Sequence, residues 1–164
     1  MEEDDVLAAR RVEATSIVNT YMGWSAGASF IPLPFADLAA VTLVQVKMVS
    51  DLAKLYEVPF SRNVVKTIIA SLLGSLVPAG VARGASSLIK AIPGVGTVLG
   101  ALTSPVFTTA STYAIGKVFI RHFEAGGNVM NLDPDSIRDH FKSDFEEGVS
   151  KASDEPSETK KAAA

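Results

Sequence analysis

Two similar stretches, each interrupted by proline, constrain the fold of this chain more than any other feature. Residues 31–41 begin with Ile-Pro and align with residues 92–102, which also begin with Ile-Pro. Each stretch lies between two apolar segments rich in small residues. Proline breaks a helix because it has no N–H donor and pushes the preceding residue out of the helical conformation. The repeat predicts two helical hairpins with uncharged tips formed by Ile31, Pro32, Leu33, Pro34 and by Ile92, Pro93, Gly94, Val95, Gly96.

The pattern of apolar residues predicts an all-α fold, since no strand-like alternation occurs along the chain. We expect one helical domain over residues 1–149. Its first hairpin covers about 6–57, and its second covers about 61–123. Asp5 is expected to cap a first helix that starts at Val6. Pro105 should lie within the helix that follows the second tip.

A short turn at Gly126-Gly127 separates the hairpins from an amphipathic C-terminal helix, expected over about 133–149. Its apolar stripe consists of Ile137, Phe141 and Phe145, and we expect this stripe to dock against the hairpins. The hairpin cations Lys54, Arg62 and Lys66 are the expected partners of its acids. Residues 150–164 have little to bury and are expected to be disordered.

Composition excludes several classes of function. Charged residues make up 20% of the 164, the net charge is −3, and no Lys/Arg cluster is dense enough to favour nucleic-acid binding. The chain has no cysteine, and His122 and His140 have no ligand-spaced partners, so we expect no metal and no cofactor. No activated nucleophile or phosphate loop is evident. We therefore expect a protein that is not an enzyme.

Three long segments without charge favour a position in or on a membrane. They are residues 14–36, 67–82 and 91–116, and Asp37 directly follows the first of them. Most lysines and arginines lie away from the two tips, as in hairpins that enter a bilayer from the cytoplasmic side. The acidic start of the chain is unlike a secretory signal and favours a cytoplasmic beginning. The alternative is a soluble bundle with closely packed Ala/Gly-rich helices.

Three glycine pairs with a spacing of four residues predict close helix packing, either within the chain or between copies of it. They are Gly23/Gly27, Gly80/Gly84 and Gly96/Gly100. Asn19, Asp37 and Gln45 are candidates for a buried polar track. For Asp37 the alternative is a carboxylate placed near a helix N-terminus, where the helix dipole favours it.

The motifs Ile31-Pro-x-Pro-x-x-Asp37, Gln45-x-x-Met48, Leu52-Ala-x-x-Tyr56 and Ile92-Pro-Gly-x-Gly96 resemble a bacterial family, domain of unknown function 697, over about residues 14–125. The resemblance implies a helical membrane module linked to small GTPases and without an assigned activity. This chain carries no GTPase domain, so the implied partner would be a separate protein.

The expected function is therefore that of a membrane-associated binding or scaffold protein. We expect it on the cytoplasmic side of a bacterial inner membrane, as a homo-oligomer that shapes or permeates the bilayer. The alternative is a soluble, cytoplasmic helical adaptor that regulates a small GTPase encoded separately.

Overall fold

The computed structural model describes residues 1–28, 36–76 and 105–154, and the regular structure in these ranges is entirely helical. The side chains of residues 26–39, 153 and 154 lie outside this description. The helices are α1 (Glu2–Ala28), α2 (Ala36–Leu55), α3 (Arg62–Ser75), α6 (Pro105–Glu124) and α7 (Pro134–Asp154). The predicted all-α class is confirmed.

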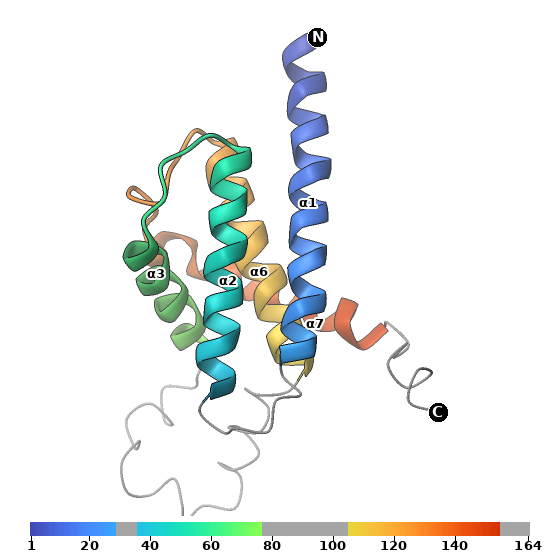
Figure 1. The fold of residues 1–164 in the computed structure, drawn as a ribbon, viewed down its shortest axis with the longest axis vertical. Coiled ribbons are helices and arrows are strands. Elements are labelled where there is room, and N and C mark those ends of the chain that lie inside the picture. Colours follow the sequence, from blue (N-terminus) through green and yellow to red (C-terminus); the bar gives the residue numbers. More distant parts are fainter. Residues whose placement is uncertain (29–35, 77–104, 155–164) are drawn as a thin grey trace, which may run out of the picture.

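Helices α1, α2 and α6 form the centre of the bundle (Figure 1). Contacts between Arg11 and Glu124 and between Ser25 and Thr112 show that α1 runs antiparallel to α6. Helix α3 packs beside α2, and α7 crosses α6 and reaches α3. The core lies where these helices meet. Its largest fully buried side chains include Phe119, Phe141, Met48, Leu52, Ile69, Leu72 and Ile115.

The predicted start of the first helix is displaced. Helix α1 begins at Glu2, so the prediction of a cap at Asp5 and a start at Val6 is wrong. Four acids occupy the first turn, where the positive end of the helix dipole favours them, and the helix extends to include them. At the start of α3, Ser61 occupies the N-cap position, although its side chain makes no capping hydrogen bond.

Helices α2 and α6 end in the same way. The Val58 N–H donates to the Ala53 carbonyl and the Glu57 N–H to the Lys54 carbonyl, which is the pattern of a Schellman motif. The corresponding pair at the end of α6 is donated by Gly127 and Gly126. The central residue of each motif has a positive φ, 57° at Glu57 and 86° at Gly126. Glycine is the usual residue in this conformation, so Glu57 is the exception.

The amphipathic C-terminal helix is present and docked, as the sequence predicts. Phe141 is fully buried, and the Phe145 ring lies 5.4 Å from that of Phe107 on α6. Helix α7 continues to Asp154, so the predicted end at residue 149 is too early. Lys151, within the added turn, lies 4.7 Å above the Tyr113 ring and near Glu147, and these contacts favour continued helix.

Several predictions fall on residues outside the described ranges. Both tips, residues 31–34 and 92–96, belong to this group, as do Gly80, Gly84 and Gly100. Pro105, expected inside a longer helix, is the first residue of the described α6. The four helix ends that lead into residues 29–35 and 77–104 all lie at one end of the bundle (Figure 1).

Candidate functional site

One end of the bundle carries no charged residue over long parts of four helices. These parts are residues 14–28 of α1, 38–46 of α2, 67–75 of α3 and 105–116 of α6. They lie at the end from which residues 29–35 and 77–104 depart (Figure 1). We call them the uncharged end. Asp37 precedes the α2 part, and its side chain lies outside the description.

The uncharged end exposes large apolar side chains. Trp24 is 66% exposed on α1, Leu43 is 46% exposed on α2, and Val106 is 37% exposed on α6. The Trp24 ring packs against that of Tyr21, with 5.9 Å between ring centroids. An apolar surface of this kind needs a partner that is itself apolar.

Inside the uncharged end, α1, α2 and α6 meet through a buried polar cluster. Ser25, Gln45, Ser111 and Thr112 are each fully buried. The Gln45 amide Nε2 donates to Ser111 Oγ at 3.1 Å and to Thr112 Oγ1 at 3.2 Å. Ser25 Oγ lies 2.8 Å from Thr112 Oγ1. These bonds fix the three helices at one level along the bundle axis.

The hydroxyl protons of the cluster are too few to give every acceptor a donor among the described residues, and the acceptor left over is Gln45 Oε1. The hydroxyls of Ser111 and Thr112 both donate to the Thr108 carbonyl, at 3.1 and 2.8 Å. Thr112 has only one hydroxyl proton, so Ser25 must donate to Thr112 and not the reverse. Within the described part of the chain, no remaining hydroxyl proton reaches the buried Gln45 Oε1, and this atom has no hydrogen-bond donor there. None of these side chains titrates near neutral pH, so the cluster joins the three helices through uncharged hydrogen bonds.

The cluster differs in part from the predicted polar track. Gln45 is buried and polar-bonded, as the sequence suggests. Asn19 is exposed on the outer face of α1, so its assignment to a buried track is wrong. The Asp37 side chain lies outside the described residues. Ser25, Ser111 and Thr112 were missed because small hydroxyl residues at helical spacing are not distinguishable from ordinary packing residues in a sequence.

The opposite end of the bundle is held by ionic contacts. Arg11 donates two hydrogen bonds to the Glu124 carboxylate, at 3.0 and 2.8 Å, and the Tyr56 hydroxyl donates a third at 3.0 Å. The bond from Arg11, followed by the bond from Tyr56, lowers the pKa of Glu124 in spite of its desolvation. Burial, reinforced by Glu124, raises the pKa of Tyr56. This end therefore joins α1, α2 and α6 through charge.

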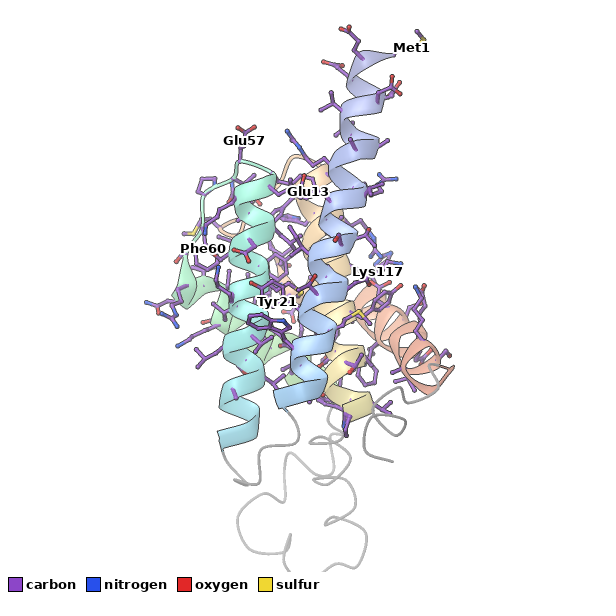
Figure 2. All side chains as sticks on the ribbon, turned by 45° about the vertical axis from the view of Figure 1, so that its right-hand side comes forward. Met1, Glu13, Tyr21, Glu57, Phe60 and Lys117 are labelled. Atoms are coloured by element: carbon purple, nitrogen blue, oxygen red, sulfur yellow. The ribbon has the colours of Figure 1, made fainter. Side chains whose placement is uncertain are left out.

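A third polar contact joins α1 to α2 beside Trp24. The Tyr21 hydroxyl donates to Asp51, which also accepts a hydrogen bond from Lys47 at 2.7 Å. Desolvation and this bond to Asp51 raise the pKa of Tyr21 to about 12. Desolvation opposes ionisation of Asp51, but the bonds from Lys47 and Tyr21 outweigh it and lower its pKa. Figure 2 shows Tyr21 between α1 and α2.

Close glycine packing occurs at positions other than the predicted ones. A Cβ at Gly148 would lie 2.9 Å from the Ala110 backbone, and a Cβ at Gly116 would lie 2.5 Å from Val18. A Cβ at Gly23 would meet nothing within 4 Å, so close packing within the chain is wrong for Gly23. Packing of Gly23 between copies of the chain is not tested, and the side-chain environment of Gly27 lies outside the description.

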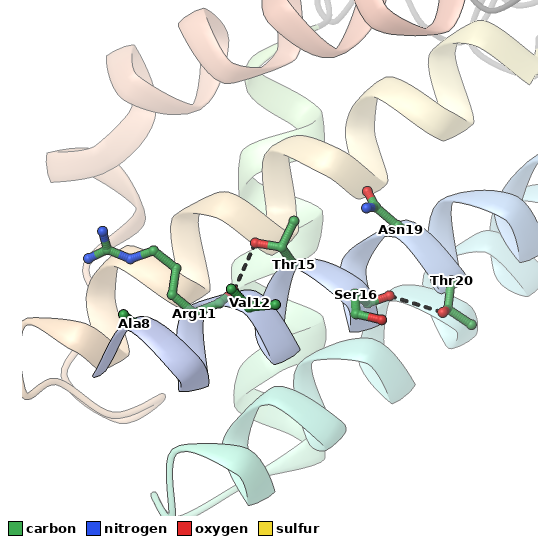
Figure 3. A pocket seen from close by; sticks show the side chains of 7 residues that line it. All are labelled: Ala8, Arg11, Val12, Thr15, Ser16, Asn19 and Thr20. Carbon is green, nitrogen blue, oxygen red and sulfur yellow. Dashed lines mark hydrogen bonds between the residues drawn. The ribbon is translucent and has the colours of Figure 1, made fainter. Parts of the chain in front are cut away.

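A hollow along the outer face of α1 does not form an enclosed site (Figure 3). All its lining residues belong to α1 and are exposed: Ala8, Arg11, Val12, Thr15, Ser16, Asn19 and Thr20. Among the described residues, no group of three or more His, Cys, Asp or Glu side chains could hold a metal ion. None of the helices in the described ranges is both long and apolar enough to span a bilayer.

Comparison with known proteins gives a family and one curated relative. The model of a family described as domain of unknown function (DUF697) matches residues 2–147, a longer range than the 14–125 of the predicted resemblance. Magnetosome membrane protein 22 of Magnetospirillum gryphiswaldense is 41% identical over 140 residues, which cover 85% of this chain and 72% of that protein. No solved structure matches.

Proposed function

The chain belongs to the DUF697 family, and from this premise we propose that it is a membrane-associated helical scaffold and not an enzyme. In this proposal the uncharged end enters the bilayer, together with the tips at residues 31–34 and 92–96. The observation that carries the proposal is the uncharged end itself, with Trp24 and Leu43 exposed on its surface. The name of the relative, magnetosome membrane protein 22, places that protein in a membrane and supports the same interpretation for this chain.

The distribution of charge supports this orientation. Apart from Asp37, which lies between the first tip and residues 38–46, the part that enters the bilayer carries no charge, and its hydroxyl groups are largely bonded within the protein. Its other residues would therefore lose little on leaving water. The ionic contacts around Glu124 lie at the other end and would stay in water. A bilayer-facing end and a water-facing end are therefore separated along the bundle axis.

The scaffold role is supported by the first turns of α1. Helix α1 projects beyond the other helices at the water-facing end (Figure 1). Val6, Leu7 and Val12 are 56%, 45% and 72% exposed there. In this proposal the projecting part binds another protein while the uncharged end holds the molecule at the membrane. Deletion of residues 1–9 should abolish protein binding and leave membrane association unchanged.

Membrane fractionation tests the proposal. The double substitution Leu33→Asp and Val95→Asp places one charge in each tip. On insertion scales a charge at bilayer depth costs about 2.5–3.5 kcal/mol, so two charges should lower partitioning by about three orders of magnitude or more. The variant should move from the membrane pellet to the supernatant. The matched control is Val12→Asp, which adds a charge at an exposed position of the water-facing end and should leave the distribution unchanged.

The extraction conditions separate this function from the alternative. The unmodified protein should resist extraction by high salt and by carbonate. Release by salt would refute insertion and favour the soluble adaptor of a separate GTPase. Retention of the double variant in the pellet would show that the tips are not what holds the protein there. Circular dichroism of each variant establishes that the helices are intact.

A further inference from the structure

The first charged residue beyond the uncharged part is a lysine on three different helices. These residues are Lys47 on α2, Lys66 on α3 and Lys117 on α6. All three reach solvent, and the side chains of Lys47 and Lys117 are 58% and 37% exposed. A lysine of this kind can extend along an apolar surface and hold its ammonium group in the headgroup region of a bilayer.

The polar cluster places two of these lysines at similar heights along the bundle axis. Gln45 and Thr112 are bonded to each other and so define one level. Lys47 follows Gln45 by two residues, and Lys117 follows Thr112 by five, which correspond to about 3 and 7.5 Å of helix rise. The backbone positions of both lysines therefore lie above the level of the cluster, on the side toward the water-facing end.

Trp24 lies at the level of the cluster, because it precedes Ser25, which contacts Thr112. Its ring is exposed, as is Leu43, one helical turn below Lys47 on α2. Tryptophan and tyrosine favour the membrane–water interface, where an apolar ring with one polar group is best accommodated. Tyr21 precedes Ser25 by four residues, about 6 Å of helix rise, so Tyr21 lies at the height of Lys47 and Lys117, and Trp24 lies below them at the level of the cluster.

We propose that Lys47, Lys66 and Lys117 form a belt that binds anionic lipid headgroups, with Trp24 seated at the boundary between headgroups and acyl chains. This inference rests on the proposed function and adds to it the depth of insertion and the class of lipid. Lys47 also contacts Asp51, and Lys117 contacts Glu147. These acids offset part of the attraction, and each lysine contributes about twofold to fivefold in affinity for an anionic surface.

Trp24 is the single tryptophan of the chain, so its fluorescence reports on this site without any engineering. The full-length protein is mixed with vesicles of phosphatidylcholine alone or of phosphatidylcholine and phosphatidylglycerol in equal parts. Vesicles containing phosphatidylglycerol should bind the protein more tightly and shift its emission to shorter wavelength. Brominated lipids should quench Trp24 more strongly when the bromine lies near the headgroup than when it lies near the chain end.

Two single variants on α2 form a matched pair. Lys47 and Lys54 both contact Asp51, at 2.7 and 3.7 Å, but Lys54 lies seven residues farther from the uncharged end. That separation is about 10 Å, close to the Debye length at moderate salt. Lys47→Gln should weaken binding to phosphatidylglycerol vesicles by about twofold to fivefold, and Lys54→Gln should change it less than twofold. The triple variant of Lys47, Lys66 and Lys117 to Gln should lose about tenfold or more.

The outcomes separate this inference from the proposed function. Equal binding to both kinds of vesicle, or tight binding without any change in Trp24 emission, overturns the belt while membrane association stands. Equal effects of Lys47→Gln and Lys54→Gln overturn it as well. Failure to bind either vesicle overturns both the belt and the proposed function. Lys47, Lys54 and Lys66 are exposed and Lys117 is partly exposed, and each variant should keep the circular dichroism spectrum of the parent.

Discussion

Replacing Glu57 by glycine should stabilise the protein, although it removes an ion-pairing side chain. Glu57 ends α2 with φ at 57°, a conformation in which a side chain is crowded by its own backbone. The left-handed conformation costs a residue with a Cβ about 1–2 kcal/mol, and glycine avoids this cost. Glycine in turn loses about 0.5–1 kcal/mol through its greater freedom in the unfolded chain. The net gain in the free energy of unfolding should be about 0.5–1 kcal/mol.

The ion pair that is lost weighs little against this gain. Arg10 lies 3.7 Å from the Glu57 carboxylate, and the Glu57 side chain is 82% exposed. Exposed pairs of this kind contribute about 0–1 kcal/mol, with most near the lower limit. Glu57→Ala removes the same carboxylate and keeps the Cβ, so it isolates the contribution of the ion pair. It should change the stability by less than about 0.5 kcal/mol.

Gly126 provides the reverse experiment at the end of α6. Its φ is 86°, and a Cβ there would meet nothing within 4 Å, so crowding by neighbours does not enter. Gly126→Ala should therefore destabilise by about 1 kcal/mol through the backbone alone.

Thermal unfolding followed by circular dichroism measures all three variants. For a chain of this size 1 kcal/mol corresponds to about 2–4 °C in Tm. Glu57→Gly should raise Tm and Gly126→Ala should lower it. If Glu57→Gly and Glu57→Ala unfold at the same temperature, the positive φ is not a source of strain and the reasoning is wrong.

Three further predictions follow from the packing and charge of the described residues. Gly148→Ala should destabilise the protein by about 1–3 kcal/mol and speed proteolysis of α7, because the added Cβ would press on the Ala110 backbone. Gly23→Ala should stabilise the protein by about 0.5–1 kcal/mol, because the added Cβ meets nothing within 4 Å and alanine favours the helix. Gln45→Leu should change the free energy of unfolding by less than about 1 kcal/mol, because it removes two hydrogen bonds but also removes a buried acceptor that lacks a donor among the described residues. A loss above about 2 kcal/mol in urea titration would show that this assignment of the hydrogen bonds is wrong. The lowered pKa of Glu124 stabilises the fold above the unfolded value near 4.5 and ceases to do so as pH falls through the folded value, so acid titration of Glu124→Gln should show a smaller loss of stability than the parent shows.

The elements with strong periodicity could be predicted from the sequence. The apolar stripe through Ile137, Phe141 and Phe145 identified α7 and its docking face, and Phe141 is fully buried. The partners of α7 were not predictable. We expected Lys54, Arg62 or Lys66 to meet its acids, and that expectation is wrong, because Arg121 and Lys117 on α6 make these contacts. Which face of a helix meets which neighbour depends on crossing geometry that periodicity does not encode.

The lack of charge at the candidate site could be predicted from the sequence, but the polar cluster buried inside it could not. The absence of charge over residues 14–28 and 105–116 is visible in the sequence, and it led to the membrane interpretation. The buried polar cluster around Gln45 could not be predicted, because Ser25 and Thr112 are 87 residues apart in the sequence. Serine and threonine are also common in packed helices, so their presence does not indicate a contact. Asn19 was wrongly predicted to be buried, because the presence of an amide side chain does not show whether its face of the helix is covered by another helix.

The two polar contacts between α1 and α6 have a mechanical consequence. Ser25 holds α1 to Thr112 near one end, and Arg11 holds it to Glu124 near the other. The two points are 14 residues apart on α1, which is about 21 Å. A rod fixed at two separated points can neither slide along its support nor turn about its own axis. Because both contacts join α1 to α6, a tilt imposed on one end of α1 should move α6 and the projecting first turns together.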